Sequence, residues 1–207
     1  MTKMSRALGL LGAALGVFMA CAPATQADPP PPILPATIAP GTPQETAIVA
    51  GGCFWGMEKV MRRAPGVLAI EVGYAGGTRT DVGYDEVSDG GTGHAESVRI
   101  VFDPTKISYA DLLKHWFFRG HDPTTRDRQG NDVGTQYRSA IFATTPQQLA
   151  TAREVEAAVD KSGKWEHPIV TQVVPATTWV RAEEHHQDYL IKHPHGYDDH
   201  YLRSFDF

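Results

Sequence analysis

From residue 45 onward, hydrophobic positions recur with the spacing of strands in some segments and of helices in others. Alternating positions or short apolar runs predict strands, and apolar residues three or four apart predict helices. Strands are predicted at residues 46–50, 67–74, 95–102, 138–143 and 169–174. Helices are predicted at residues 53–63, from Ser108, from Thr145 and at residues 181–192. Their irregular alternation predicts an α/β (α+β) fold, a two-layer sandwich whose mixed sheet is flanked by helices.

Local signals set several boundaries. Ser108 and Asp111 resemble a capping box, and Thr145 followed by Pro146 suits the first turn of a helix. The glycine-rich segment 75–93 and the polar segment 119–136 lack a clear period and are predicted to be loops.

The first 44 residues follow neither pattern. Lys3 and Arg6 precede the uncharged apolar run 7–20, which favours a secretory signal at residues 1–20 over a buried helix. Residues 18–21 resemble a lipobox, so Cys21 is a candidate lipid anchor, although cleavage at residues 22–24 or 25–27 would also suit a signal. We expect export to the periplasm or cell envelope.

Residues 21–44 hold eight of the 15 prolines of the chain, four of them consecutive. Proline favours extended polyproline II structure, so this segment is predicted to be a semi-rigid spacer, with a ligand for an aromatic groove as the alternative. The folded catalytic domain is then expected at residues 45–207.

Composition narrows the function. The 207 residues carry a net charge of −5, and no basic stretch indicates binding to nucleic acid. Two cysteines are too few for a disulfide scaffold or a multi-cysteine metal site.

Cys53 is the only cysteine of the predicted domain, and it follows Gly51-Gly52 where a strand gives way to a helix. The amides and dipole of a helix N-terminus stabilise a thiolate and lower the pKa of a thiol. We therefore favour Cys53 as a nucleophile over a buried, inert cysteine. Because Phe54 and Trp55 follow it directly, at least one aromatic ring is expected beside the sulfur.

Four further side chains stand in or beside glycine-punctuated segments: Tyr84, Glu96, Asp132 and Tyr137. Each alone is more typical of a surface position. Cys53, Glu96 and Tyr137 stand within motifs, and Tyr84 and Asp132 lie between them along the chain. The chain contains four such motifs, which are Gly52-Cys53-Phe54-Trp55-Gly56, Gly73-Tyr74-Ala75-Gly76-Gly77, Gly93-His94-Ala95-Glu96 and Gly134-Thr135-Gln136-Tyr137-Arg138-Ser139. In these motifs the chain resembles the peptide methionine sulfoxide reductases of the A type.

The resemblance implies a ferredoxin-like fold and reduction of the S epimer of methionine sulfoxide, free or in oxidised proteins. It implies that Cys53 attacks the sulfoxide sulfur, that Glu96 protonates the oxygen, and that Tyr84 and Tyr137 hydrogen-bond to that oxygen. The reaction leaves Cys53 as a sulfenic acid.

The resemblance also implies a binding site for the substrate. Phe54 and Trp55 would hold the S-methyl group, Asp132 would order a water molecule or a polar neighbour, and His186 would border the site. We expect no cofactor and no metal. Residues 18–21 make Cys21 the one candidate for membrane contact, through a lipid anchor.

Many members of that family carry recycling cysteines in a C-terminal tail, whereas residues 54–207 contain none. We therefore expect an external thiol, such as a thioredoxin-like protein, to restore Cys53.

The histidines leave two alternatives open. Cys53 with His94 or His186 could form a hydrolase. Five histidines could hold a metal ion in a non-catalytic domain, although their spacing is not that of a zinc site; they are His185, His186, His193, His195 and His200.

Overall fold

The computed structural model describes residues 32, 34 and 37–207. The predicted signal at residues 1–20, Cys21 and most of the proline-rich spacer lie outside the described residues. Within the described ranges, no helix has the length and apolar character needed to cross a membrane.

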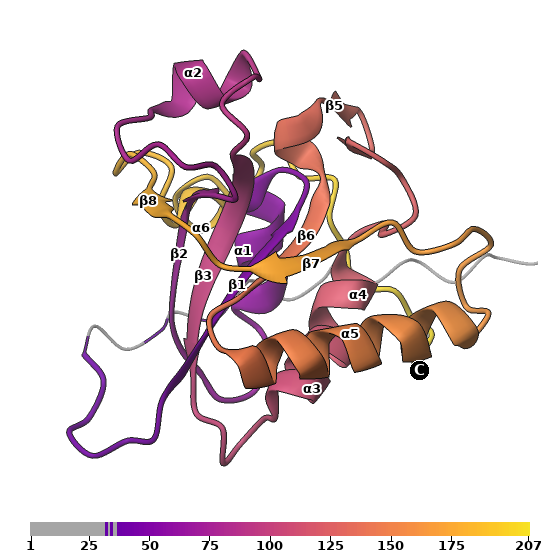
Figure 1. Ribbon diagram of the computed structural model, residues 1–207. Helices are drawn as coiled ribbons and strands as arrows, with labels where there is room; N and C mark the ends of the chain where they lie inside the picture. The colour runs from indigo at the N-terminus through magenta and orange to yellow at the C-terminus, as the bar shows by residue number, and fades with distance from the viewer. Residues whose placement is uncertain (1–31, 33, 35–36) are drawn as a thin grey trace, which may run out of the picture.

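The described chain contains one large sheet, a short hairpin and helices of several lengths (Figure 1). The strands are β1 (Glu45–Gly51), β2 (Val67–Ala75), β3 (Ala95–Phe102), β4 (Arg128–Gln129), β5 (Asp132–Val133), β6 (Ser139–Ala143), β7 (Gln172–Pro175) and β8 (Trp179–Arg181). The α-helices are α1 (Phe54–Met61), α2 (Tyr84–Ser88), α3 (Tyr109–Asp111), α4 (Phe118–Gly120), α5 (Pro146–Lys161) and α6 (Tyr189–Lys192). A π-helix covers Leu112–Phe117 and a 3₁₀ helix covers Thr135–Tyr137.

Six strands form the large sheet in the order β7-β6-β1-β3-β2-β8. β6 and β7 run parallel, while the other neighbours are antiparallel, so the predicted mixed sheet with flanking helices is confirmed. β1 lies near the middle of this sheet, and the chain turns from its end directly into α1 (Figure 1).

Alternation along β1 explains the layers. Ala47 and Val49 belong to the main core, which includes Met57 of α1 and Val155 of α5. Ile48, like Ala50, points to the other face, where a smaller apolar cluster contains Phe142 and Trp179. Side chains of a strand alternate between the faces of its sheet, so one strand contributes to both clusters. The helices and the main core thus share one face of the sheet.

The helix predicted at residues 181–192 is wrong over most of its length. β8 takes Arg181 into the sheet beside β2, and only Tyr189–Lys192 is helical. Gln187 makes hydrogen bonds with the N–H and the C=O of Val72, and Asp188 has a left-handed backbone with φ 54°. These tertiary contacts override the helix propensity of a segment rich in Glu, His and Gln.

Smaller differences occur in the loops. The predicted loop 75–93 contains helix α2, and the predicted loop 119–136 contains the hairpin of β4 and β5. The strand predicted at residues 169–174 is instead Gln172–Pro175. Both unexpected elements are short, and α2 and β5 contribute side chains to the site described below.

Candidate active site

The corner between β1 and α1 places Cys53 at the N-terminus of the helix. Gly52 has φ +99°, and a Cβ added there would lie 2.4 Å from Cγ of Gln129, so no other residue fits without rearrangement. Cys53 is a free thiol and is only 7% exposed. The corner therefore holds one buried thiol at a fixed position above the sheet.

A cavity of about 90 Å³ surrounds this sulfur. It gathers side chains that are up to 144 positions apart in the chain. The lining residues are Cys53, Phe54, Trp55, Tyr84, Glu96, Asp132, Tyr137 and Tyr197. Seven of the eight predicted site residues thus share one cavity. They come from α1, α2, β3, β5 and the 3₁₀ helix.

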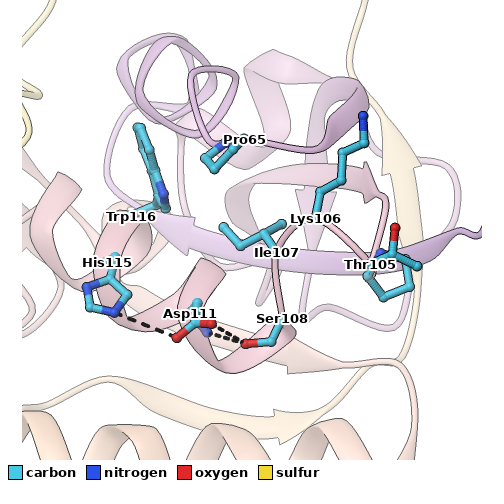
Figure 2. A pocket seen from close by; sticks show the side chains of 9 residues that line it. Pro65, Thr105, Lys106, Ile107, Ser108, Asp111, His115 and Trp116 are labelled. Carbon is cyan, nitrogen blue, oxygen red and sulfur yellow. Dashed lines mark hydrogen bonds and ion pairs between the residues drawn. The ribbon is translucent and has the colours of Figure 1, made fainter.

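A larger pocket of about 420 Å³ lies at the other end of α1, beside Pro65 and Trp116 (Figure 2). Three of its polar side chains are paired with one another, since Ser108 Oγ donates to Asp111 Oδ2 at 2.7 Å and His115 contacts the same carboxylate. This pocket contains no nucleophile comparable with Cys53. The chemistry therefore points to the smaller cavity.

Glu96 stands at the start of β3, lines the same cavity as Cys53 and is only 3% exposed. The Phe54 N–H donates to its Oε2 at 3.0 Å. Burial raises the pKa of Glu96 to about 8, with Asp132 adding to the shift and the Phe54 N–H opposing it. Glu96 can therefore hold a proton at neutral pH and donate it inside the cavity.

The prediction that the helix N-terminus lowers the pKa of the Cys53 thiol is wrong for the protein without bound substrate. Burial raises the pKa of the Cys53 thiol, and Glu96, Asp132 and Asp199 add to it when they are charged. The Trp55 N–H acts in the predicted direction but is outweighed. The first amide of α1 serves Glu96 instead of the sulfur.

Three tyrosines and Asp132 complete the lining of the cavity. Burial raises the pKa of Tyr137, so its hydroxyl stays a hydrogen-bond donor. The Tyr84 N–H donates to Oε1 of Glu183 at 2.9 Å, which fixes the start of α2. Tyr197 donates its hydroxyl to Oδ2 of Asp132 at 3.1 Å. The predicted role of Asp132 in ordering a polar neighbour thus has a candidate in Tyr197.

His186 does not line the cavity. Its ring lies behind the aromatic wall, with ring centroids 5.2 Å from Phe54, 5.7 Å from Trp55 and 4.7 Å from Tyr84. Burial lowers the pKa of His186, so the ring is neutral near pH 7. It supports the wall without reaching the substrate space.

The geometry gives little support to the two alternatives, a Cys–His hydrolase and a histidine metal site. His94 bonds through Nε2 to the Arg79 carbonyl at 3.1 Å, and neither His94 nor His186 is among the residues that line the Cys53 cavity. Across residues 37–207 and the two described residues before them, no three His, Cys, Asp or Glu side chains gather to hold a metal ion.

Several residues of the site carried no signal in the sequence. Tyr197 lines the cavity, Glu183 anchors Tyr84, and Tyr189 stacks on Trp55 with centroids 3.7 Å apart. All three follow β7. Glu183 and Tyr189 lie in the segment predicted to be a helix, and no sequence motif singles out any of the three. Only tertiary structure brings them to the cavity.

Comparison with known proteins agrees with this geometry. The family model described as "Peptide methionine sulfoxide reductase" matches residues 45–206. The chain belongs to this family. It is an oxidoreductase that reduces methionine sulfoxide in a thiol-dependent reaction and thereby repairs oxidised proteins.

Individual relatives extend the similarity. Peptide methionine sulfoxide reductase MsrA of Nocardia farcinica is 51% identical over 162 residues, covering 78% of this chain and 92% of the relative. The crystal structure of reduced Mxr1 from Saccharomyces cerevisiae is 35% identical, with a TM-score of 0.75, over 83% of this chain and 99% of Mxr1. Mxr1 in complex with Trx2 is also similar, with 26% identity, a TM-score of 0.54 and the same shares covered.

Because Glu96 titrates near pH 8, it gives the reductase a pH-dependent stability. A buried acid whose folded pKa is raised stabilises the fold while protonated, and that contribution falls as pH rises from about 4.5 to 8. Glu96→Gln should therefore gain stability over the wild type between pH 5 and pH 8, by about 3–4 kcal/mol or roughly 6–16 °C in Tm. Thermal unfolding of both proteins across this range measures the difference, and parallel curves would contradict the raised pKa.

Proposed function

We propose that this reductase acts on the S epimer of methionine sulfoxide through Cys53 as nucleophile and Glu96 as general acid. The observation that carries the proposal is that Cys53, the one thiol among the residues that the structure describes, and the proton-holding carboxyl of Glu96 share one cavity at the N-terminus of α1. Single-turnover reduction of the two epimers of a methionine sulfoxide peptide tests the choice of epimer directly. Equal rates with both epimers would contradict it.

The chemistry follows from the two groups. The sulfoxide oxygen is a poor leaving group until it is protonated, so Glu96 donates its proton there while Cys53 attacks the sulfur. The proton that the Cys53 thiol loses in the attack returns to the Glu96 carboxylate. The substrate sulfur gains two electrons and departs as methionine. The Cys53 sulfur loses two electrons and takes the oxygen, which leaves a sulfenic acid.

The cavity also orients the substrate. Tyr84 and Tyr137 place hydroxyl groups where the oxygen would gain negative charge, which favours the transition state over the bound sulfoxide. Phe54 and Trp55 form an apolar wall for the S-methyl group. His186 and Tyr189 hold these rings in place from behind.

An external thiol completes the cycle. The sulfenic acid condenses with a donor thiol to give a mixed disulfide and water, and a second donor thiol releases the Cys53 thiol and a donor disulfide. Residues 54–207 contain no second cysteine that could replace the donor. A thioredoxin-like protein is the proposed donor, in keeping with the similarity to Mxr1 in its complex with Trx2.

Without a donor, the purified protein should stop after one turnover. Excess substrate is expected to yield about one methionine per enzyme and a dimedone adduct on Cys53, since no other thiol of the domain can condense with the sulfenic acid. Mass spectrometry of the protein, together with quantitation of methionine, measures both.

The matched control is Cys21→Ser, which removes the only other cysteine. It should show the same stoichiometry and the same adduct. A Cys21–Cys53 disulfide in the wild type, in place of the dimedone adduct and again with about one methionine formed, would refute recycling by an external thiol alone.

Two narrower parts of the proposal concern location and fold class. The basic residues and apolar run at 1–20 support export, with Cys21 as a lipid anchor and the donor as a thiol carrier of the periplasm or cell envelope. The sheet order and the helices on one face support a ferredoxin-like classification. Labelling with radioactive palmitate, compared between the wild type and Cys21→Ser, tests the anchor.

A further inference from the structure

The segment Tyr197–His200, which we call the C-terminal wall, lies against the corner that carries Cys53. Tyr197 lines the cavity, and Asp198 forms an ion pair with Lys59 of α1. Lys59 Nζ also lies 3.4 Å from the His200 carbonyl. The wall is therefore attached both to the cavity and to the helix that begins at the nucleophile.

His200 makes the closest contacts of the wall with the corner. Its ring is buried, and its Nε2 lies 2.7 Å from the Gly51 carbonyl, 149 positions away in the chain. Because a carbonyl only accepts, Nε2 carries the proton and donates it. A Cβ added at Gly52 would lie 3.2 Å from the ring, and one added at Gly56 would lie 2.3 Å from it. The ring thus packs against backbone on both sides of Cys53.

Neighbouring carboxylates fix the direction of this ring. The backbone N–H of His200 donates to Asp198 Oδ1 at 3.0 Å, which holds the main chain beneath the ring. Asp199 Oδ1 lies 2.7 Å from Nδ1 of the ring, although the geometry is not that of a hydrogen bond. The side chain of Asp199 is itself only 14% exposed. Together these contacts aim Nε2 at the Gly51 carbonyl.

The other side of the corner is packed as well. His121 lies against Gly51, where an added Cβ would be 2.9 Å from its ring, and it is held by Ser139 Oγ at 2.7 Å. Burial lowers the pKa of His121 to about 3, so this ring is neutral. Between these two rings, the backbone leading to Cys53 has little room to move.

We propose that His200, oriented by Asp199, is a positioning residue that holds the Gly51–Cys53 corner at the distance and angle from which the thiolate attacks. The inference rests on the proposed role of Cys53. A nucleophile displaced by about 1 Å can lose about 100-fold in rate, although the substrate still binds. His200 should therefore act on the chemical step and not on affinity for the sulfoxide.

The test compares His200→Leu, which fills the space without a donor, with His200→Gln, whose amide can still donate to the Gly51 carbonyl. Single-turnover methionine formation at increasing peptide sulfoxide concentration gives a rate constant and a half-saturation concentration. We expect His200→Leu to lower the rate constant roughly 10–100-fold and to change half-saturation less than about threefold. His200→Gln should stay within about threefold of the wild type in both.

Matched variants separate positioning from general damage. His195→Gln changes an exposed histidine of the same segment and should behave as the wild type. Asp199→Asn keeps the shape of its side chain but removes the charge beside Nδ1, and it should lower the rate constant several-fold. If His200→Leu fails to fold, as thermal unfolding would show, His200→Gln and Asp199→Asn carry the test.

Three results would overturn the inference. His200→Leu could keep the wild-type rate constant, His200→Gln could lose as much as His200→Leu, or Asp199→Asn could match the wild type. A wild-type protein that forms no methionine would instead refute the proposed function, so the two failures are distinguishable.

Discussion

Cys53→Ser is expected to abolish sulfoxide reduction, with a loss of more than about 10⁴-fold in single-turnover methionine formation. A serine hydroxyl has nearly the same size but is a far weaker nucleophile at neutral pH, and it cannot form a sulfenic acid. Burial already raises the pKa of the Cys53 thiol, so the cavity gives no help to an even weaker acid. The fold should be unchanged because the substitution replaces one atom.

The test measures methionine formation by Cys53→Ser and by Cys21→Ser side by side, with dithiothreitol as the thiol donor. Cys21→Ser should retain the rate, since it lies outside the predicted catalytic domain. Measurable turnover by Cys53→Ser, with an unfolding temperature equal to that of the wild type, would show that Cys53 is not the nucleophile.

Glu96→Gln should lower the rate constant of methionine formation by about 10²–10⁴-fold, which is the usual contribution of a general acid. The amide keeps the shape of the side chain and can still accept the Phe54 N–H, but it cannot transfer a proton. Affinity for the sulfoxide should change little, because the lost interaction is made in the transition state.

Glu86→Gln is the matched control, since Glu86 lies on the exposed side of α2 and pairs with Arg79. It should react at the wild-type rate. Full activity of Glu96→Gln at pH 7 would place the acid elsewhere, with Tyr137 and Tyr84 as the next groups to replace.

The regular elements of the fold were predictable where local signals and burial agree. β3 matches the predicted strand 95–102, and Thr145 caps α5 as expected, with its side chain accepting from the Gln148 N–H. Residues 181–192 show the limit. Their composition favours a helix, but pairing with β2 and the hydrogen bonds of Gln187 to Val72 decide the structure.

The site residues likewise divide into those that the sequence could identify and those that depend on the completed fold. Residues next to a motif could be named from the sequence, because Cys53, Glu96 and Tyr137 stand inside glycine-bounded segments that meet at the cavity. Tyr197, Tyr189 and His200 could not, since their roles depend on contacts across more than 100 positions. The direction of the thiol pKa shift was missed for a related reason, because burial is a property of the completed fold.

The span of the site along the chain has a consequence for how activity is gained and lost. Cys53 stands near the start of the domain, whereas Tyr197, which lines the same cavity, is synthesised 144 positions later. A nascent chain can form the central strands before it has a closed cavity, so its thiol is exposed but not yet competent for repair. On heating, local detachment of the segment that carries Tyr197 needs less free energy than global unfolding, and activity is therefore lost before the sheet melts.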